Sequence, residues 1–418
     1  MTRKSLPLTS SEFSSLLERI PTPFYLYDGD GIRENARKLY SAFSWADGFI
    51  DFFAVKALPN VNILRFLKGL GFGADCSSLP ELLLAKEAGM EEGSIVFTSN
   101  DTPQEEFEAA IDMGVILNLD DITHIDRVLE TGRAFPKRIC FRYNPGPERT
   151  GNAIIGNPVE AKYGVTKDQV IDCYKRAKAL GSEVFGLHTM VASNELDENY
   201  IVETARMVFS LVKRIRQEAG VAISFVDLGG GVGIPYREKD DGIDFPSLSG
   251  RIRELYDEMI LKEGLGPLRI TFEMGRAITG PYGYLVSSVR HVTHKYKDYV
   301  GLDASMADLM RPAIYGAYHH ITVLGKEESA RDHIYDVTGS LCENNDKFAV
   351  DRHLPEIKRG DVLVIHDAGA HSHSMGFNYN AKLRHAEYLK LDGRIYKIRR
   401  DETYSDYVRT MLPEMEEI

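Results

Sequence analysis

Cysteine is scarce in this chain, and its cysteines are not paired in sequence. The widely spaced cysteines are Cys76, Cys140, Cys173 and Cys342, with no Cys-x-x-Cys motif. A disulfide framework and a thiolate zinc site are therefore both disfavoured, and a reducing compartment fits. Long apolar stretches are also missing, both at the N-terminus, where a signal peptide would lie, and elsewhere. We therefore expect a cytoplasmic protein that does not span a membrane.

Positive charge is in short supply. The chain has 50 Lys and Arg against 62 Asp and Glu, a net charge of -12. No basic stripe is available to offset phosphate repulsion, which disfavours nucleic acids and anionic membranes as partners. Small molecules are the expected ligands. The 12 histidines include no His-Glu-x-x-His motif, and His371 and His373 fit ordinary surface or site-lining positions better than a metal site, so no metal is expected.

Short β-branched or aromatic runs alternate with amphipathic stretches through the first two thirds of the chain. The runs predict strands near 49–55, 71–75, 94–98, 114–119, 138–143, 184–188, 223–228 and 269–274. The amphipathic stretches predict helices near 60–70, 80–90, 103–112, 121–131, 167–181, 198–219 and 247–262. Strands joined by helical crossovers in this number favour an α/β fold, a (β/α)8 TIM-type barrel, over an open sheet.

The sequence pattern changes after residue 285, where short strand-like segments are separated by turns. These segments are 282–292, 296–302, 333–338, 361–366, 384–390 and 394–399. They predict an antiparallel β domain, and the N-terminal run 22–28 is a further strand that could join it. The expected domains are a barrel over 30–282 and a β domain over 1–29 and 283–418. The long irregular stretch 144–163 is either a lid over a site or a surface excursion, and we favour the lid.

Lys56 is the most informative single residue. It follows the apolar run Phe53–Val55, which reads as a buried strand with an amine at its end. A dry environment disfavours the ammonium form, so we expect a lowered pKa and a nucleophilic amine able to capture a carbonyl cofactor as a Schiff base. A solvated strand end is the simpler alternative for this residue.

Other polar groups and glycines also end the predicted barrel strands. Catalytic residues of barrel enzymes gather at the C-terminal strand ends. The residues in that position here are Lys56, Asp75, Arg142 with Asn144, His188, the glycines 229–231, and Glu273 with Arg276. Each could be a turn or capping residue, but the whole set together favours an active site.

Two of these strand ends suggest particular contacts. The run Gly229–Gly231 lets backbone N–H groups approach a phosphate, although it matches neither a Rossmann nor a Walker motif and could be a plain turn. Glu273 could keep a pyridine nitrogen protonated, which makes a pyridoxal ring an electron sink. Arg276 could hold a substrate carboxylate. Alternatively, Glu273 and Arg276 could form only a local ion pair with each other.

These segments resemble the pyridoxal phosphate-dependent decarboxylases of the alanine racemase fold (fold type III), most closely the diaminopimelate decarboxylases. The resemblance extends from Phe24 to Asn380, nearly the whole chain. The motifs that carry it are Ala54-Val55-Lys56-Ala57, Gly229–Gly231, Glu273-Met274-Gly275-Arg276, Asp308–Tyr315 and Cys342–Asp346.

The resemblance implies a role for each matching residue. Lys56 would bind pyridoxal 5'-phosphate, Glu273 would pair with its ring nitrogen, and Cys342 or Lys56 would return a proton to the substrate carbon. The implied cofactor-binding set is Lys56, Asp75, Arg142, His188, Met190, Ser193, Gly230, Gly231, Glu273, Gly275, Arg276 and Tyr379. The implied substrate-binding set is Arg276, Arg311, Tyr315, Glu343 and Tyr379. The segment of Cys342 and Glu343 would reach the active site of a second subunit, so a homodimer with shared sites is expected.

Glu343 favours meso-diaminopimelate, decarboxylated to L-lysine, over ornithine, because the aspartate typical of ornithine decarboxylases is absent there. The chain departs from the family pattern at Met190, where a histidine usually stacks on the cofactor, and at Ala192, Met274 and His371. These changes leave open a related amino acid, such as ornithine, lysine or a specialised-metabolism substrate. A racemase or a non-catalytic homologue is less favoured, since both would have less use for the Cys342-Glu343 pair.

Overall fold

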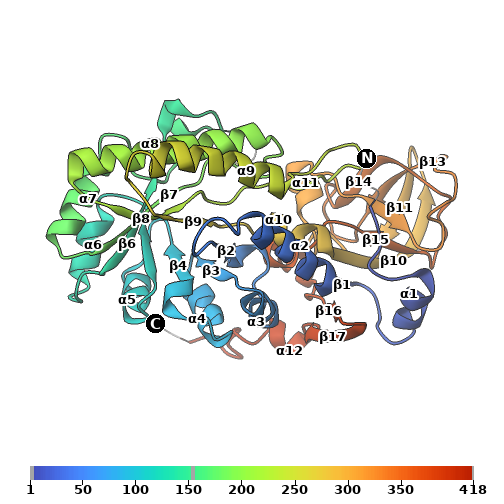
Figure 1. Cartoon of the computed structure of the whole chain (residues 1–418). Coiled ribbons are helices and arrows are strands. Elements are labelled where there is room, and N and C mark those ends of the chain that lie inside the picture. Colours follow the sequence, from blue (N-terminus) through green and yellow to red (C-terminus); the bar gives the residue numbers. More distant parts are fainter. Residues whose placement is uncertain (1–3, 152–155, 417–418) are drawn as a thin grey trace. The chain divides into compact units, whose positions relative to one another are not determined.

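The chain folds into two compact units. The computed structural model describes residues 4–151 and 156–416. One unit comprises residues 33–234 and 241–278, and the other comprises the remainder of the chain, including the short segment 235–240. The first unit is the barrel and the second is built on a β-sheet (Figure 1).

The barrel unit contains a closed barrel of parallel strands in sequence order. Its strands within the described residues are β2 Ile50–Ala54, β3 Gly73–Cys76, β4 Ile95–Thr98, β5 Ile116–Leu119, β6 Arg138–Tyr143, β7 Val184–Thr189, β8 Ile223–Asp227 and β9 Arg269–Phe272. Pairing of β2 with β9, Ile50 opposite Thr271, closes the barrel. All the predicted barrel strands are present, and the predicted (β/α)8 fold is confirmed.

Helices connect the strands on the outside of the barrel (Figure 1). They are α3 Val61–Gly69, α4 Leu79–Glu87, α5 Gln104–Asp112, α6 His124–Glu130, α7 Val170–Ala179, α8 Glu198–Ala219 and α9 Phe245–Tyr256, the last continued by a π-helical turn over Asp257–Leu261. The longest, α8, shows why they form: Asp197 caps its first turn, apolar residues recur on one buried face, and Gly220 ends it with φ of 62°.

Apolar side chains from several of the barrel strands pack together. Ile50, Phe52, Val96, Ile116, Cys140 and Phe225 form one buried apolar cluster. A packed layer of this kind makes the barrel a solid support rather than a pore. The polar strand ends therefore have a rigid base.

The second unit contains a sheet in the order β14-β13-β11-β10-β1-β16-β17; β15 also pairs with β10, and β12 pairs with β15. Its strands are β1 Phe24–Asp28, β10 Gly283–His294, β11 Asp298–Leu302, β12 Ile321–Val323, β13 His333–Thr338, β14 Lys347–Leu354, β15 Val362–Ile365, β16 Glu387–Leu391 and β17 Arg394–Arg399. The N-terminal strand β1 joins this sheet, as the sequence suggested, and lies between β10 and β16.

The predicted antiparallel β domain is present, but two of its strand pairs are parallel. Strand β1 runs parallel to β16, and β11 runs parallel to β13. Both pairs are separated by long connections, which allow the chain to return to the same end of the sheet before it pairs. The sheet is therefore mixed.

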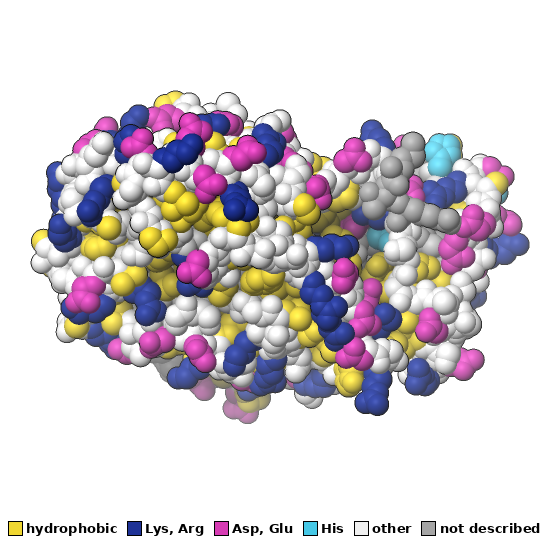
Figure 2. Space-filling model, in the orientation of Figure 1, with side chains coloured by type: hydrophobic (Ala, Val, Ile, Leu, Met, Phe, Trp, Pro, Cys, Tyr) yellow, Lys and Arg dark blue, Asp and Glu magenta, His cyan; other side chains and the backbone are white. Residues whose placement is uncertain are grey.

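Several elements were absent from the sequence prediction. They are α1 Ser10–Leu17, α2 Gly29–Ala42, α10 Arg276–Thr279, α11 Arg311–Tyr315, α12 Tyr404–Tyr407, β12 and β14. No described helix is long and apolar enough to cross a bilayer. On the face drawn in Figure 2, basic and acidic side chains are interspersed.

The described part of the predicted lid, residues 144–151 and 156–163, contains two short 3-10 turns, Gly146–Glu148 and Pro158–Glu160. Residues 152–155 of that prediction lie outside the described residues. The Asn144 side-chain amide donates to the Pro158 carbonyl at 3.0 Å and to the Tyr163 carbonyl at 3.1 Å. These bonds join the second described part of the segment, residues 156–163, to Asn144, the residue just after β6.

Candidate active site

Six of the predicted site residues line one cavity of about 370 Å³ in the barrel unit. They come from the ends of five different strands or the residues just beyond them, as expected for a barrel enzyme. The described residues that line it are Lys56, Asp75, Ser77, Thr98, Ser99, Asn100, Arg142, Lys162, His188, Met190 and Glu273.

Lys56 lies on a 3-10 turn, Val55–Ala57, that begins where β2 ends. A close approach positions this turn: a Cβ on Gly275 would lie 2.7 Å from the Cβ of Ala57, so only glycine fits there without a shift. The segment that follows Glu273 is thereby brought against the turn that carries Lys56.

The expected lowering of the Lys56 pKa was wrong. The Lys56 Nζ lies 3.3 Å from Asp75 Oδ2, and the lysine side chain is 51% exposed. Asp75 raises the pKa of Lys56, and this effect outweighs the opposing effect of burial. The sequence shows an apolar strand before the lysine but not the carboxylate brought to its amine from the next strand.

Asp75 itself is fully buried, and burial with the nearby Glu273 raises its pKa to about 6 although Lys56 opposes this. Its Oδ1 has no hydrogen-bond partner among the described residues. Asp75 therefore forms a charge pair with Lys56 through Oδ2, while its Oδ1 is still able to accept a proton.

Glu273 and His188 form the second polar pair of the cavity. Glu273 Oε2 lies 3.1 Å from His188 Nε2, and both side chains are buried. Burial raises the pKa of Glu273, but His188, Lys56 and Arg142 outweigh it and leave this pKa lowered. Burial lowers the pKa of His188, but Glu273 and Asp227 outweigh it and raise this pKa. Glu273 is therefore an ionised carboxylate supported by the imidazole.

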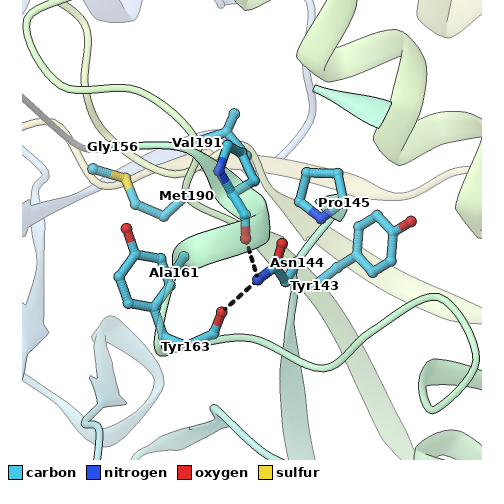
Figure 3. Close-up of a pocket in the computed structure, with 9 residues that line it drawn as sticks. Tyr143, Asn144, Pro145, Gly156, Ala161, Tyr163, Met190 and Val191 are labelled. Atoms are coloured by element: carbon cyan, nitrogen blue, oxygen red, sulfur yellow. Dashed lines mark hydrogen bonds between the residues drawn. The ribbon is translucent and has the colours of Figure 1, made fainter. Parts of the chain in front are cut away.

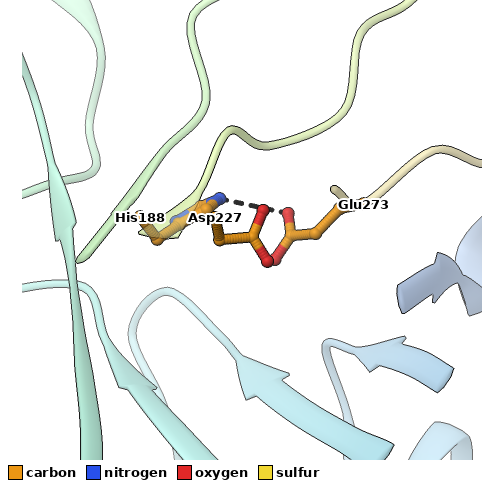
Figure 4. Close-up of side chains that lie close together, drawn as sticks. All are labelled: His188, Asp227 and Glu273. Atoms are coloured by element: carbon orange, nitrogen blue, oxygen red, sulfur yellow. Dashed lines mark hydrogen bonds and ion pairs between the residues drawn. The ribbon is translucent and has the colours of Figure 1, made fainter. Parts of the chain in front are cut away.

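Asp227, at the end of β8, faces the same pair, and its carboxylate lies beside that of Glu273 in Figure 4. Burial and the charge of Glu273 raise its pKa to about 7. Ligand atoms of His188, Asp227 and Glu273 lie within 4.8 Å of one another, a spacing that a metal ion could also use. The absence of a metal remains a prediction.

The glycine run lies beside the segment after β7. Gly231 has φ of 84°, and a Cβ there would lie 2.3 Å from the Ala192 carbonyl oxygen. The Glu195 N–H donates to the Gly231 carbonyl at 2.8 Å, which places Ser193 in the chain segment that runs along the glycines. The Gly230 N–H donates to Met190 Sδ at 3.3 Å. A phosphate cradle at Gly230, Gly231 and Ser193 stays a prediction.

Met190 also borders a second, smaller pocket, which is lined mainly by residues of 143–145 and 156–163 (Figure 3). Tyr163 lines this pocket, and the Arg142 guanidinium carbon lies 4.6 Å from its ring centroid. Arg142 Nε lies 2.8 Å from Asp120 Oδ1, so its charge is paired. Met190 therefore separates the larger cavity from an aromatic pocket.

Sequence reasoning missed several residues of this site. Ser77, Thr98, Ser99, Asn100 and Lys162 line the cavity, and Asn118 holds the far side of His188. The polar cluster Thr98–Asn100 begins at the last residue of a predicted strand, which was the available signal. Asn118 lies within a strand, and nothing local marks it as part of the site.

Of the remaining predicted residues, Arg311, Tyr315, Cys342, Glu343 and Tyr379 belong to the second unit. Arg311 is buried; its Nη1 donates to the Tyr236 hydroxyl at 2.6 Å and lies 3.2 Å from His319 Nε2. Tyr315 and Tyr379 are exposed, as is Cys342, whose N–H donates to the Asn380 side chain at 2.7 Å. Glu343 accepts a bond from the Asn345 N–H at 3.0 Å. Gly275 and Arg276 lie in the barrel unit, at the start of α10.

The cavity residues fit pyridoxal phosphate. This cofactor needs a reachable amine, an ionised carboxylate for its ring nitrogen and room for its ring. Lys56 supplies a half-exposed amine, and Glu273 Oε1, which has no hydrogen-bond partner among the described residues, supplies a buried acceptor. The chemistry of the donor set and the space of the cavity agree with the cofactor that the sequence suggested.

Comparison with known proteins gives a consistent result. Residues 30–280 match a family described as pyridoxal-dependent decarboxylase, pyridoxal binding domain. Protein TabA of Pseudomonas amygdali pv. tabaci is 39% identical over 97% of this chain and 94% of its own. Diaminopimelate decarboxylase of Methanothermobacter thermautotrophicus is 36% identical over 94% of this chain and 92% of its own.

Solved structures of diaminopimelate decarboxylases are similar to this chain over nearly its whole length. Diaminopimelate decarboxylase of M. jannaschii superimposes with a TM-score of 0.88 and 30% identity, over 96% of this chain and 94% of that chain. The complex of that enzyme with L-lysine gives the same TM-score at 31% identity over the same shares.

Proposed function

The chain belongs to the pyridoxal-dependent decarboxylases and is a pyridoxal phosphate-dependent carboxy-lyase of the diaminopimelate decarboxylase type; from this premise, we propose that its substrate is meso-diaminopimelate, converted to L-lysine and carbon dioxide. The observation that carries the proposal is similarity to diaminopimelate decarboxylases over nearly the entire chain. Glu343, next to the exposed Cys342, supports it further, because this substrate has a second amine and carboxylate to be held.

The cofactor, when bound, supplies an electron sink for the bond to the departing carboxylate. Lys56 is the residue that would hold its aldehyde carbon, and Glu273 the one that would hold its ring nitrogen protonated. Gly230, Gly231, Ser193, Gly275, Arg276 and the Tyr379 hydroxyl are the proposed phosphate contacts. Asp75 keeps Lys56 paired, and Met190 would lie against the ring, where a thioether makes a favourable contact with an aromatic face.

The residues of the second unit would complete the reaction. The Arg311 guanidinium, held by Tyr236, would bind a substrate carboxylate together with Arg276, Tyr315 and Tyr379. Glu343 would hold the distal amine. The Cys342 thiol, or the Lys56 amine, would deliver the proton that replaces the lost carboxylate.

A related amino acid is the second candidate substrate. The identity to Protein TabA, 39%, exceeds that to the diaminopimelate decarboxylase of M. thermautotrophicus, 36%. Met190 also occupies a position where the family pattern has histidine. Both observations favour a branch with an altered pocket.

A substrate panel tests the proposal. The purified enzyme with pyridoxal phosphate is incubated with meso-diaminopimelate, ornithine, lysine and further amino acids, and carbon dioxide and product amines are quantified. We expect release of carbon dioxide and L-lysine from meso-diaminopimelate. Turnover of another amino acid alone would replace this substrate, and product that retains its carboxylate would indicate racemisation.

We also propose a cytoplasmic homodimer, with domain boundaries at 30–282 and at 1–29 with 283–418, whose active sites combine Lys56 of one subunit with Cys342 of the other. Complementation tests the shared site: the Lys56→Ala and Cys342→Ala variants are each inactive or impaired, and co-expression produces mixed dimers. Random pairing should restore about one quarter of the wild-type sites. No gain of activity in the mixed dimers would mean that each site is built within one subunit.

A further inference from the structure

The His188 imidazole is held on both of its ring nitrogens. Its Nε2 lies 3.1 Å from Glu273 Oε2, and its Nδ1 lies 2.9 Å from Asn118 Nδ2. Asn118 Nδ2 also donates to Thr98 Oγ1 at 2.9 Å. The imidazole and these partners are buried, so the ring has one well-defined orientation.

This arrangement determines which nitrogen of His188 carries a proton. The Asn118 amide points its NH2 group at Nδ1, so Nδ1 accepts and Nε2 carries the hydrogen. If the amide were turned over, its oxygen would face Nδ1–H, and an ionised Glu273 would still require a proton on Nε2. In both orientations Nε2 donates to Glu273.

Glu273 needs this donor because burial raises its pKa, and His188 is the first of the groups that lower it. Three buried carboxylates lie near it: burial raises the pKa values of Asp51, Asp75 and Asp227, and the charge of Glu273 raises each of them further. Lys56 and Arg142 are the cations that act on Glu273 from the cavity side. A buried carboxylate among carboxylates takes up a proton unless a donor favours its charged form.

We infer that His188, held by Asn118, is a positioning residue that keeps Glu273 ionised and occupies Oε2, so that Oε1 is left to hold the ring nitrogen of the cofactor protonated. This inference rests on the proposed role of Glu273 and is independent of which amino acid is the substrate. Asn118 acts on Glu273 only indirectly, because it fixes the imidazole ring of His188 and not the carboxylate itself.

A matched pair of variants isolates the Nε2 contact. In His188→Gln the amide nitrogen reaches the position of Nε2 and can donate to Glu273. In His188→Asn the amide reaches only the position of Nδ1, so the bond to Glu273 is lost. Asn118→Ala is a third variant, which leaves the imidazole in place but removes its support.

The measurement compares two cofactors. Each variant is titrated with pyridoxal phosphate and with its 1-deaza analogue, in which carbon replaces the ring nitrogen, and the Kd ratio is obtained. A general structural defect weakens both ligands alike, whereas loss of an ionised Glu273 weakens only pyridoxal phosphate.

We expect the wild type to prefer pyridoxal phosphate about tenfold or more, the effect of one buried charged hydrogen bond. His188→Gln should keep most of this preference, His188→Asn should reduce it to about twofold or less, and Asn118→Ala should give an intermediate ratio.

Two results would overturn the inference. One is a wild-type preference retained in full by His188→Asn, and the other is equal loss in His188→Gln and His188→Asn. Failure of the proposed role of Glu273 looks different: the wild type and Glu273→Gln would then show the same Kd ratio. Should His188→Asn not fold, an unchanged ratio in Asn118→Ala would equally contradict the role of the Asn118–His188 pair.

Discussion

Replacement of Asp75 by asparagine should make Lys56 a faster nucleophile. The Asp75 carboxylate lies 3.3 Å from the lysine Nζ and raises its pKa. Removing this charge removes the main reason for the ammonium form, although Glu273 and Glu81 still favour it. The neutral amine, which reacts with an aldehyde, then becomes more abundant at neutral pH.

The geometry gives the size of this effect. For charges separated by 3.3 Å, Coulomb's law gives about 5 kcal/mol at an effective dielectric constant of about 20 and about 1.3 kcal/mol in water. The lysine side chain is 51% exposed, so solvent screening brings the value close to the lower limit. A working value of about 2 kcal/mol corresponds to a roughly 30-fold increase in the neutral fraction of the amine.

The assay measures cofactor capture by the apoenzyme. Apoenzyme and saturating pyridoxal phosphate are mixed at neutral pH, aliquots are reduced with borohydride at timed intervals, and the adduct on the Lys56 peptide is quantified by mass spectrometry. Asp75→Asn should form the adduct on the order of 30-fold faster than the wild type. Asp75→Glu, which retains the charge, is the control.

A rate for folded Asp75→Asn that equals or falls below the wild-type rate would refute this reasoning. The same rate for Asp75→Glu and Asp75→Asn would do so too, because charge would then not control the amine. A lower rate of adduct formation in both variants would indicate that the size and position of the Asp75 side chain matter rather than its charge.

Three further predictions concern other parts of the molecule. Asp227 ionises near pH 4 when unfolded but has a folded pKa raised to about 7, so between these values the folded chain retains a proton that the unfolded chain has lost, and stability falls as pH rises. As pH rises from 5 to 8, the free energy of unfolding of Asp227→Asn should therefore increase relative to that of the wild type by on the order of 2 kcal/mol. Urea unfolding of the apoprotein measures it; a difference between the two proteins that does not change with pH would exclude this titration. Tyr27→Phe removes the 2.6 Å bond from a buried hydroxyl to Glu387 and should lower the free energy of unfolding by about 1–3 kcal/mol, whereas an unchanged value would show that the bond adds nothing. Arg311→Met should raise KM for the amino acid about 10- to 100-fold while the cofactor absorbance stays as in the wild type, and an unaltered KM would remove Arg311 from the substrate site.

Local patterns were sufficient for the barrel. Each of its strands is an apolar run bounded by turn residues, so the order of elements and the polar strand ends could be read directly from the sequence. The grouping of Lys56, Asp75, Arg142, His188 and Glu273 in one cavity then follows from barrel geometry, because parallel strands bring their carboxyl ends to one rim.

Contacts between distant residues could not be read in this way. The raised pKa of Lys56 depends on Asp75, nineteen positions away, and Asn118 meets His188 across seventy positions. The parallel pairing of β1 with β16 joins the two ends of the chain. Helix α2 begins with Gly-Asp-Gly, which reads as a turn, so its start was missed.

The second unit is built from segments that are far apart in the sequence, and this has a consequence for synthesis on the ribosome. Strand β1 sits between β10 and β16, and Tyr236, which supports Arg311, comes from the short segment 235–240. A nascent polypeptide must therefore keep β1 unpaired until its partners emerge, after the whole barrel sequence has been translated. A fragment that starts at residue 279 would lack an inner strand of its sheet, so the gene cannot be divided at that point into two self-sufficient halves.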